Sequence, residues 1–182
     1  ANKILMNDET LTDLSAYMVG PYAGLAPYAR ARQTTSTDII PLSTGSILGT
    51  DGAFGVLGVS EPVSDRYVLI PSEILAINNA RVAYNSIVTG IVASNTTKLA
   101  LADVDAALTA LITAQAGIYN GVTITPNINP PTGIYSEDGV HPNTRGYAFL
   151  ANVFIDAINA KFGSTIPRAN LAKYSATGLP LP

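Results

Sequence analysis

Two long helical patterns, separated by short strand-like segments, restrict the possible folds of this chain more than any other feature. Residues 71–91 repeat apolar side chains at helical spacing. Residues 142–163 do the same between Asn143, a typical N-cap, and Gly163, a typical residue just beyond a helix. A further helix is predicted at residues 104–116. Helices that alternate with strands favour an α/β layered domain with a mainly parallel sheet.

Each long helix has one apolar stripe, which we expect to face a core because an amphipathic helix buries its apolar side. The stripe of residues 71–91 consists of Ile74, Ile77, Ala80, Tyr84, Ile87, Val88 and Ile91. The stripe of residues 142–163 consists of Tyr147, Leu150, Ala151, Phe154, Ile158 and Phe162.

The predicted strands are few and short. They are residues 38–42, which contain a proline, residues 98–103, which lead into the core, and residues 122–125. Two or three strands are too few for a sheet that is covered by helices on both faces. We therefore expect part of the sheet to lie outside this chain.

The remaining segments are predicted as one N-terminal helix and irregular structure. Residues 2–19 place apolar side chains at a rough helical spacing, which Gly20-Pro21 ends. Residues 43–64 are rich in Gly and Ser and form a long inserted loop, with a hairpin candidate around residues 50–52. Residues 168–182 lack periodicity and are expected to form an irregular, extended or loose tail.

Composition excludes several classes of protein. The chain has 182 residues, of which 47% are hydrophobic and 13% charged, so it can bury a core and is not a disordered segment. The formal net charge is -3, and no cluster of Lys and Arg provides the basic surface of a nucleic-acid binder. Every apolar run is interrupted too soon to span a membrane. We therefore expect no nucleic-acid partner.

The counts of cysteine and histidine limit the chemistry further. The chain contains no cysteine, which excludes disulfides and thiolate catalysis. It contains one histidine, His141, so a zinc site with several histidines cannot form within it. Any imidazole base must therefore be His141.

The block Asp138-Gly139-Val140-His141-Pro142 has the residue types that acyl transfer requires. An imidazole takes the proton of a serine hydroxyl, and a carboxylate holds the imidazole in the right tautomer. Because Gly139 permits a tight turn, the Asp138 carboxylate can reach Nδ1 of His141 and leave Nε2 facing a substrate cleft. The alternative is ordinary turn chemistry, since Asp-Gly and Pro-Asn are common in turns.

Residues 138–148, with the sequence DGVHPNTRGYA, closely resemble the last conserved block of the SGNH (GDSL) hydrolases. Members of that family are esterases and lipases of flavodoxin-like α/β fold, and their Asp-x-x-His block supplies the acid and the base. Residues 65–73, 83–85 and 101–103 are similar to the middle of bacterial, especially Bacteroidetes-type, members. The resemblance extends from about residue 25 to residue 167.

This resemblance implies a flavodoxin-like three-layer fold with a mainly parallel sheet, of which residues 1–182 would be the C-terminal part of a single domain. It implies that His141 is the general base and then the general acid, and that Asp138 is the orienting carboxylate. No cofactor and no metal are expected. The substrate would be a small-molecule or lipid ester, and the location would be extracytoplasmic, at the cell envelope, because related bacterial members are often exported or lipid-anchored.

The chain departs from the family pattern at the nucleophile and the oxyanion hole. No Gly-Asp-Ser sequence occurs, and the pair Asn7-Asp8 lacks the glycine that precedes such a pair in the family. Ser43, Ser46 and Ser136 are expected to be loop or turn hydroxyls. The serine and the oxyanion donors are therefore expected from a preceding segment of the same protein or from a companion chain.

Three other side chains near the block have weaker assignments. Tyr135 and Tyr147 could line an acyl or leaving-group pocket, although aromatic residues beside a helix start are more often core. Arg145 is expected to bond a helix-end carbonyl or a surface carboxylate. Two further functions stay open beside the esterase: a non-catalytic binding or structural module of the cell envelope, and one half of a split hydrolase.

Overall fold

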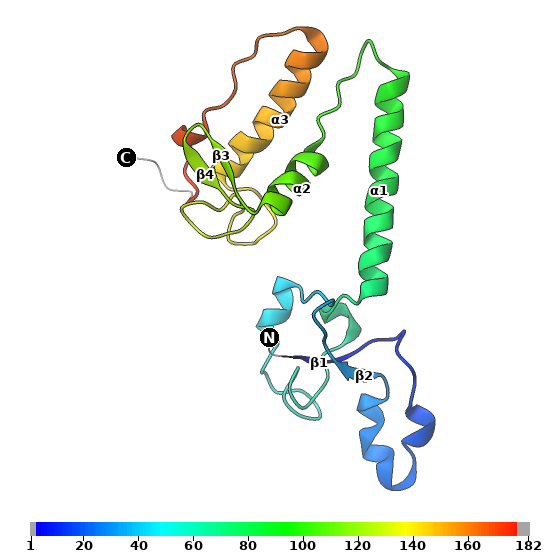
Figure 1. Ribbon diagram of the computed structural model, residues 1–182. Coiled ribbons are helices and arrows are strands. Elements are labelled where there is room, and N and C mark those ends of the chain that lie inside the picture. The colour runs from blue at the N-terminus through cyan, green and yellow to red at the C-terminus, as the bar shows by residue number, and fades with distance from the viewer. Residues whose placement is uncertain (1–2, 178–182) are drawn as a thin grey trace. The chain divides into compact units, whose positions relative to one another are not determined.

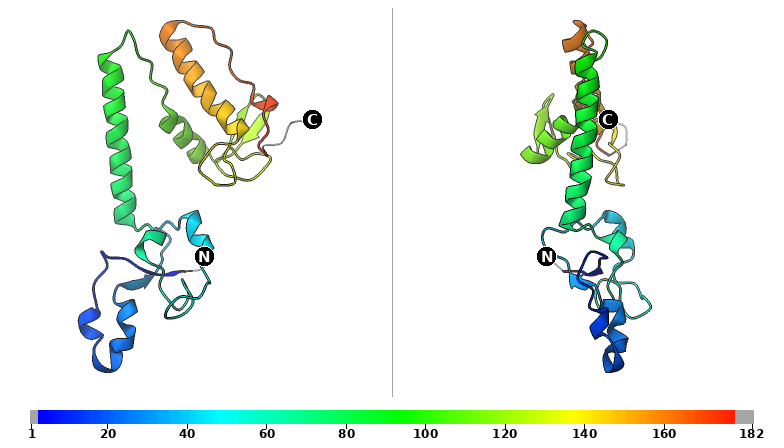
Figure 2. Two further views of the ribbon diagram at one scale, coloured as in Figure 1. Left: turned by 180° about the vertical axis from the view of Figure 1, so that it is seen from behind. Right: turned by 90° about the vertical axis from the view of Figure 1, so that its right-hand side faces the viewer.

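The computed structural model describes residues 3–177 and divides into two compact units (Figure 1). Unit 1 comprises residues 1–84 and unit 2 residues 85–182, and the boundary lies within the helix α1, Pro71–Ser94. Both units combine helices with small antiparallel sheets, so the chain is a mixed α and β protein. Two further views of the same ribbon are given in Figure 2. No helix among the described residues is both long and apolar enough to cross a membrane.

Unit 1 is built on one short hairpin-like sheet. Strand β1, Leu5–Asn7, pairs antiparallel with β2, Ala31–Gln33, so that Met6 lies opposite Arg32. The small core consists of Met6, Val63, Val68 and Ile70. The rest of the unit contains four 3-10 helices: η1 Ser15–Tyr17, η2 Gly20–Tyr28, η3 Leu42–Ser46 and η4 Asp65–Tyr67.

Residues 2–19 do not form the predicted helix. Their apolar spacing was misleading because β1 is a strand, and the side chain of Asp8 ends it by accepting the backbone N–H of Thr10 at 2.7 Å. The predicted strand at residues 38–42 is also wrong, since only Ile39 pairs, in an isolated bridge with Leu69. The inserted loop at residues 43–64 is confirmed as largely irregular, and a bridge between Asp51 and Val56 closes a turn near the expected hairpin.

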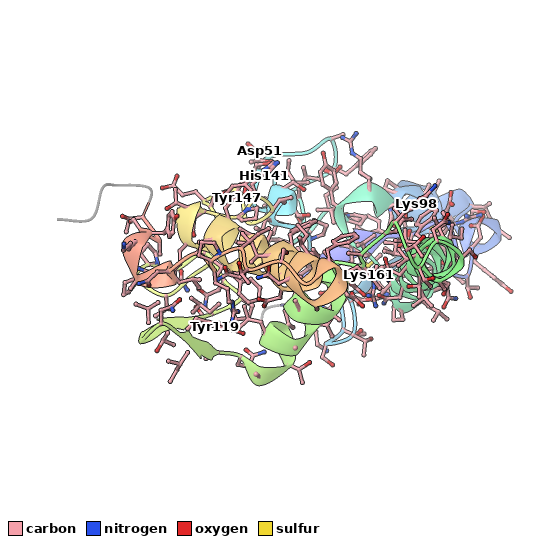
Figure 3. All side chains as sticks on the ribbon, turned by 90° about the horizontal axis from the view of Figure 1, so that it is seen from above. Asp51, Lys98, Tyr119, His141, Tyr147 and Lys161 are labelled. Atoms are coloured by element: carbon pink, nitrogen blue, oxygen red, sulfur yellow. The ribbon has the colours of Figure 1, made fainter. Side chains whose placement is uncertain are left out.

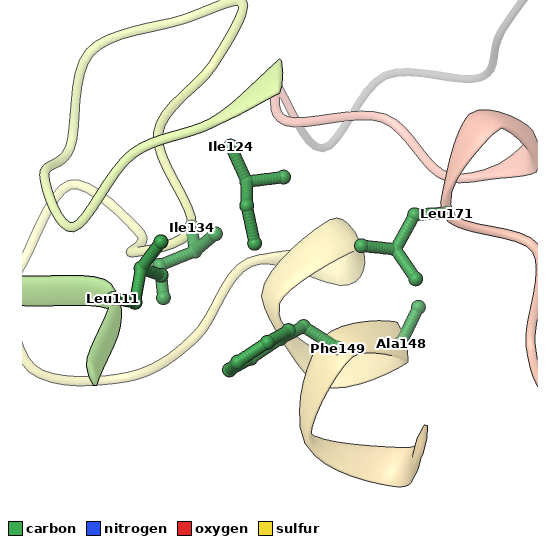
Figure 4. Packing of buried hydrophobic residues seen from close by; sticks show 6 residues of the cluster. All are labelled: Leu111, Ile124, Ile134, Ala148, Phe149 and Leu171. Atoms are coloured by element: carbon green, nitrogen blue, oxygen red, sulfur yellow. The ribbon is translucent and has the colours of Figure 1, made fainter. Parts of the chain in front are cut away.

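Unit 2 packs two helices around a second hairpin. Helix α2, Val104–Ala114, leads into β3, Gly117–Tyr119, which pairs antiparallel with β4, Val122–Ile124. Helix α3, Thr144–Phe162, is followed by the 3-10 helix η5, Leu171–Lys173. The side chains in Figure 4 form the core of this unit, in which the ring of Phe149 also meets the ring of Tyr119 edge-on. The core residues are Leu111, Ile124, Ile134, Ala148, Phe149 and Leu171.

The helix predictions of unit 2 are confirmed, but the sheet prediction is not. Residues 98–103 form no strand, because the carboxylate of Asp103 accepts the N–H of Ala106 at 2.8 Å and caps α2 instead. The strand at residues 122–125 is present as β4, but its neighbour β3 runs antiparallel. Within residues 3–177 the parallel pairings are isolated bridges, so the expected mainly parallel sheet is not observed there.

The apolar stripes of the long helices are largely exposed, although Leu150 of the α3 stripe packs against the core of unit 2. Tyr147 and Phe154 in α3 are 55% and 51% exposed, and α1 has no buried residue. The residues of α3 that are buried lie in its first half, where Ala148 and Phe149 join the core of unit 2. These buried residues are Arg145, Gly146, Ala148, Phe149 and Asn152.

The tail is irregular as predicted, but it is not loose over residues 169–177. The side chain of Leu171 is fully buried in the core of unit 2, and the backbone N–H of Ala169 donates to Oδ1 of Asn152 at 2.7 Å. Residues 178–182 of the predicted tail lie outside the described residues. The single-domain expectation stays a prediction.

Candidate active site

A tight turn immediately before α3 carries the predicted acid and base. The backbone N–H of Ser136 donates to the carbonyl of His141 at 2.8 Å, and the N–H of Gly139 donates to the carbonyl of Ser136 at 2.9 Å. Gly139 has a φ of 71°, a left-handed conformation that glycine adopts without strain. The turn therefore needs the glycine of the Asp-Gly-Val-His sequence.

The turn brings the carboxylate of Asp138 onto the imidazole of His141. Oδ2 of Asp138 lies 2.5 Å from Nδ1 of His141. The other oxygen, Oδ1, accepts the backbone N–H groups of Val140 and His141, both at 3.0 Å, and the hydroxyl of Ser136 at 2.7 Å. The predicted pairing of the two site residues is thus present, with both carboxylate oxygens occupied.

These contacts keep Asp138 ionised. The hydrogen bond to His141, followed by those from Ser136 and the two backbone N–H groups, holds the pKa of Asp138 well below its usual range. The side chains of His141 and Asp138 are 71% and 49% exposed, so their attraction is screened by water. The carboxylate is therefore a charged acceptor that orients the ring.

The pairing also assigns the tautomer of His141. An ionised carboxylate accepts, so the proton of the neutral imidazole is assigned to Nδ1, and the lone pair lies on Nε2. Nε2 makes no hydrogen bond within residues 3–177. The arrangement can accept a proton at Nε2 and stabilise the resulting imidazolium through Asp138.

Asn143 fixes this turn to the start of α3. Its Oδ1 accepts the N–H of Gly146 at 3.0 Å, as an N-cap does, and its Nδ2 donates to the carbonyls of Gly133, Tyr135 and Ala176. The side chain is buried, so these bonds form away from water. One capping residue thus joins the helix, the loop before the turn and the C-terminal tail.

Arg145 has a structural position. Its side chain is buried, and it donates from Nε to the carbonyl of Tyr174 at 2.9 Å and from a terminal nitrogen to the carbonyl of Pro131 at 2.6 Å. The expectation that it bonds a carbonyl is confirmed in kind. One carbonyl belongs to the loop before the turn, and the other belongs to Tyr174, the C-cap of the 3-10 helix η5.

A groove of about 700 Å³ lies beside the turn. Tyr135 and Tyr147 both line it, as the sequence suggested, and Figure 3 places His141 and Tyr147 together at the N-terminal end of α3. Asp138 contributes to the wall but His141 does not, because its ring projects into solvent. The expectation that Nε2 faces a cleft is therefore not met by the described residues. The remaining lining residues include Ile128, Pro130, Pro142 and Ala176.

The candidate serines bond other groups within their own units. The hydroxyl of Ser136 bonds Oδ1 of Asp138, on the acid side of the pair, which agrees with a turn residue that supports the carboxylate. Ser46 donates to the carbonyl of Ser43 within η3 of unit 1. Asn7 ends a strand, and its Nδ2 donates to the carbonyl of Pro27 at 2.9 Å. Within residues 85–177 of unit 2, no serine hydroxyl bonds Nε2 of His141.

Comparison with known proteins identifies no relative: no family model, no curated protein and no solved structure matches this chain.

Sequence analysis missed one group of polar residues. Asp8, Asp65 and Glu73 converge in unit 1, although Asp8 is more than 50 residues from the other two in the chain. Each is an ordinary acidic residue of a turn or a first helical turn, so its local sequence carries no signal. Only the meeting of three distant segments reveals the cluster.

Proposed function

We propose that this chain supplies the acid and the base of an SGNH-type (GDSL) carboxylic-ester hydrolase. The observation that carries the proposal is the pair Asp138–His141, in which Nδ1 is held by the carboxylate at 2.5 Å while Nε2 is open. The resemblance of residues 138–148 to the family's Asp-x-x-His block supports it.

His141 acts first as base and then as acid. Its Nε2 takes the proton of a serine hydroxyl while the serine oxygen forms a bond to the ester carbonyl carbon, whose π electrons move to the carbonyl oxygen. The imidazolium is stabilised by Asp138. When the tetrahedral intermediate collapses, Nε2–H protonates the leaving alcohol, and a water molecule then repeats the sequence on the acyl-enzyme.

The serine and the oxyanion donors come from outside these residues, either from a preceding segment of the same protein or from a companion chain. Exposed apolar side chains support this proposal, since a large apolar surface marks a contact site. In α1, Ile77, Ile87 and Ile91 are all more than half exposed. The same added segment would complete a flavodoxin-like parallel sheet.

The substrate is a small-molecule or lipid ester. The groove beside Asp138 has apolar and aromatic walls from Ile128, Pro130 and Tyr147, which suits an acyl chain or an apolar leaving group. An envelope location is proposed on the family resemblance.

Hydrolysis of p-nitrophenyl butyrate by the assembled protein tests the role of His141. The variant His141→Ala should lose roughly 10³-fold or more in kcat/KM, because proton transfer at Nε2 is removed. The control is Lys161→Gln, an exposed residue in the last turn of α3 and outside the lining of the groove, which should keep wild-type activity. Retention of activity by His141→Ala would rule out the assignment.

A fluorophosphonate probe, which reacts with activated serines, separates the esterase from the alternatives. The 182-residue chain by itself should not be labelled, whereas a mixture with the companion segment should be labelled on that segment. Labelling of a serine within this chain would contradict an external nucleophile. Absence of labelling in the complete protein would favour a non-catalytic envelope module.

A further inference from the structure

Three carboxyl groups from three separate segments meet in unit 1. Asp8 follows β1, Asp65 lies in η4, and Glu73 lies in the first turn of α1. One oxygen from each of them lies within 4.8 Å of the others. The fold therefore concentrates negative charge at the junction of a strand, a 3-10 helix and a long helix.

Two oxygens of this cluster are shielded from water and accept no N–H or hydroxyl from outside it. Asp8 is 1% exposed, and its Oδ1 accepts the N–H and the hydroxyl of Thr10 at 2.7 and 2.5 Å. Its Oδ2 and Oδ1 of Asp65 are both buried and accept no N–H or hydroxyl from other residues, so the neighbouring carboxyl group is the partner of each. Buried carboxylate oxygens without a positive partner lower the free energy of unfolding, so a positive group at the site would stabilise the fold.

The nearby arginines are engaged elsewhere. Arg32 donates to both oxygens of Asp38 at 2.7 Å, and Arg30 donates to the carbonyl of Glu9 and to Asp13. Burial and the neighbouring Asp8 carboxylate raise the pKa of Asp65, and Glu73 and Glu9 contribute in the same direction. Either a shared proton or a bound cation must therefore offset the charge.

We propose that Asp8, Asp65 and Glu73 bind a Ca²⁺ ion. Ca²⁺ takes six to eight oxygen ligands at about 2.3–2.6 Å, so ligands on opposite sides of the ion are up to roughly 5 Å apart. The separations in the cluster fall within that limit. The ligands are all hard oxygens, without the imidazole or thiolate that favours zinc or copper.

The adjoining cavity can supply the remaining ligands. It has a volume of about 550 Å³ and is lined by Asn7, Asp8 and Asp65. Oδ1 of Asn7 is buried without a partner, because Nδ2 of the same amide is the group that bonds Pro27. This amide oxygen and water molecules that enter the cavity would be additional oxygen ligands and would raise the coordination number of the ion.

The ion would stabilise a unit with few other means of stabilisation. Only four residues form its buried core, and the three ligands join β1, η4 and α1. Because the cluster is assembled only in the folded chain, binding is coupled to folding. This inference does not depend on the hydrolase proposal.

Calcium titration of the complete 182-residue chain, after removal of metal with EDTA, tests the inference by calorimetry. The expected result is one saturable site, with a thermal transition of unit 1 that rises with CaCl₂. Luminescence of Tb³⁺ excited through tyrosine gives a second readout. Absence of saturable binding up to millimolar Ca²⁺ would overturn the proposal, and tighter binding of Mg²⁺ than of Ca²⁺ would overturn the choice of ion.

Two isosteric variants locate the site. Asp65→Asn and Glu73→Gln should each weaken Ca²⁺ binding by about tenfold or more, because each removes one charged ligand. Asp51→Asn is the matched control: Asp51 is an exposed carboxylate of unit 1 that lies outside both the cluster and the lining of the cavity, so Ca²⁺ affinity should be kept. Since Asp8 also holds the Thr10 turn, Asp8→Asn is less suitable. Unchanged binding in Asp65→Asn and Glu73→Gln, with folding verified by circular dichroism, would place the ion elsewhere.

Discussion

Two aspartates, Asp38 and Asp138, each bind a side-chain nitrogen that lies a few residues away, in Arg32 and in His141. We expect the first pair to affect stability and the second to affect catalysis. In each pair a carboxylate binds a cationic or ring nitrogen within six residues and also accepts a backbone N–H of its own turn, from Thr35 in the first pair. The pKa values of both aspartates are lowered, by the arginine in one case and by the histidine in the other.

The two pairs differ in burial and in what they leave free. The side chain of Asp38 is fully buried, and both its oxygens bind the guanidinium of Arg32. Asp138 is half exposed, and the imidazole that it holds keeps Nε2 open. A saturated, buried pair can only stabilise, whereas an exposed pair with one open nitrogen can move a proton.

The largest expected effect is on catalysis at the exposed pair. Asp138→Asn should lower kcat of the proposed hydrolase, assembled with its serine, by on the order of 10²–10⁴-fold, because the amide no longer stabilises the imidazolium. The loss should be smaller than that of His141→Ala. Stopped-flow or steady-state ester hydrolysis measures it, with urea unfolding as the check that stability changes little. An unaltered kcat would remove Asp138 from the mechanism.

The buried pair should respond in stability. Asp38→Asn leaves the Arg32 guanidinium without its carboxylate, so we expect a loss of about 2–4 kcal/mol in the free energy of unfolding. Urea denaturation measures the loss, and ester hydrolysis per folded molecule should stay at the wild-type rate. If Asp38→Asn lost as little stability as Asp138→Asn, burial would not explain the difference between the two pairs.

A glycine substitution tests how tightly the scaffold of the exposed pair is packed. A Cβ on Gly146 would lie 2.1 Å from the carbonyl oxygen of Ile134, so Gly146→Ala should destabilise unit 2 by about 1–3 kcal/mol. Gly90 in α1 has open space around it, so Gly90→Ala should stabilise the helix by about 0.5–1 kcal/mol. Thermal unfolding of both variants, followed at 222 nm, should show shifts of opposite sign.

The smallest expected effect is the pH dependence at the exposed pair. Because the pKa of folded Asp138 is lowered, its contribution to stability is present above the unfolded value of about 3.9 and is lost as pH falls toward the folded pKa. The difference in urea midpoint between wild type and Asp138→Asn should therefore shrink below about pH 4.

Asp65 should show the opposite sign in the absence of calcium. Its folded pKa is raised, so its contribution is present at low pH and is lost as pH rises through that folded pKa. Asp65→Asn should therefore gain stability relative to wild type as pH rises, when EDTA is present. A gain of the same size in saturating CaCl₂ would count against the calcium site.

Local sequence signals predicted elements whose hydrogen bonds close within a few residues. Asn143 and Gly163 bound α3 as expected, and the Asp-Gly-Val-His turn closes onto Nδ1. One such signal was overlooked: Asn120-Gly121, with φ values of 51° and 79°, is the typical two-residue turn of the β3–β4 hairpin. That dipeptide would have predicted the antiparallel pairing.

By itself, the sequence determined the caps of α3, the tight turn, and the pairing of Asp138 with the one histidine of the chain. These depend on donors and acceptors a few residues apart, which any folded form of the chain brings together. The tertiary structure decided which face of α3 is buried and that Leu171 of the tail is buried in the core. It also decided that Asp8, Asp65 and Glu73 lie close together. Burial and charge clustering arise from contacts between distant segments, and neither periodicity nor motif spacing contains that information.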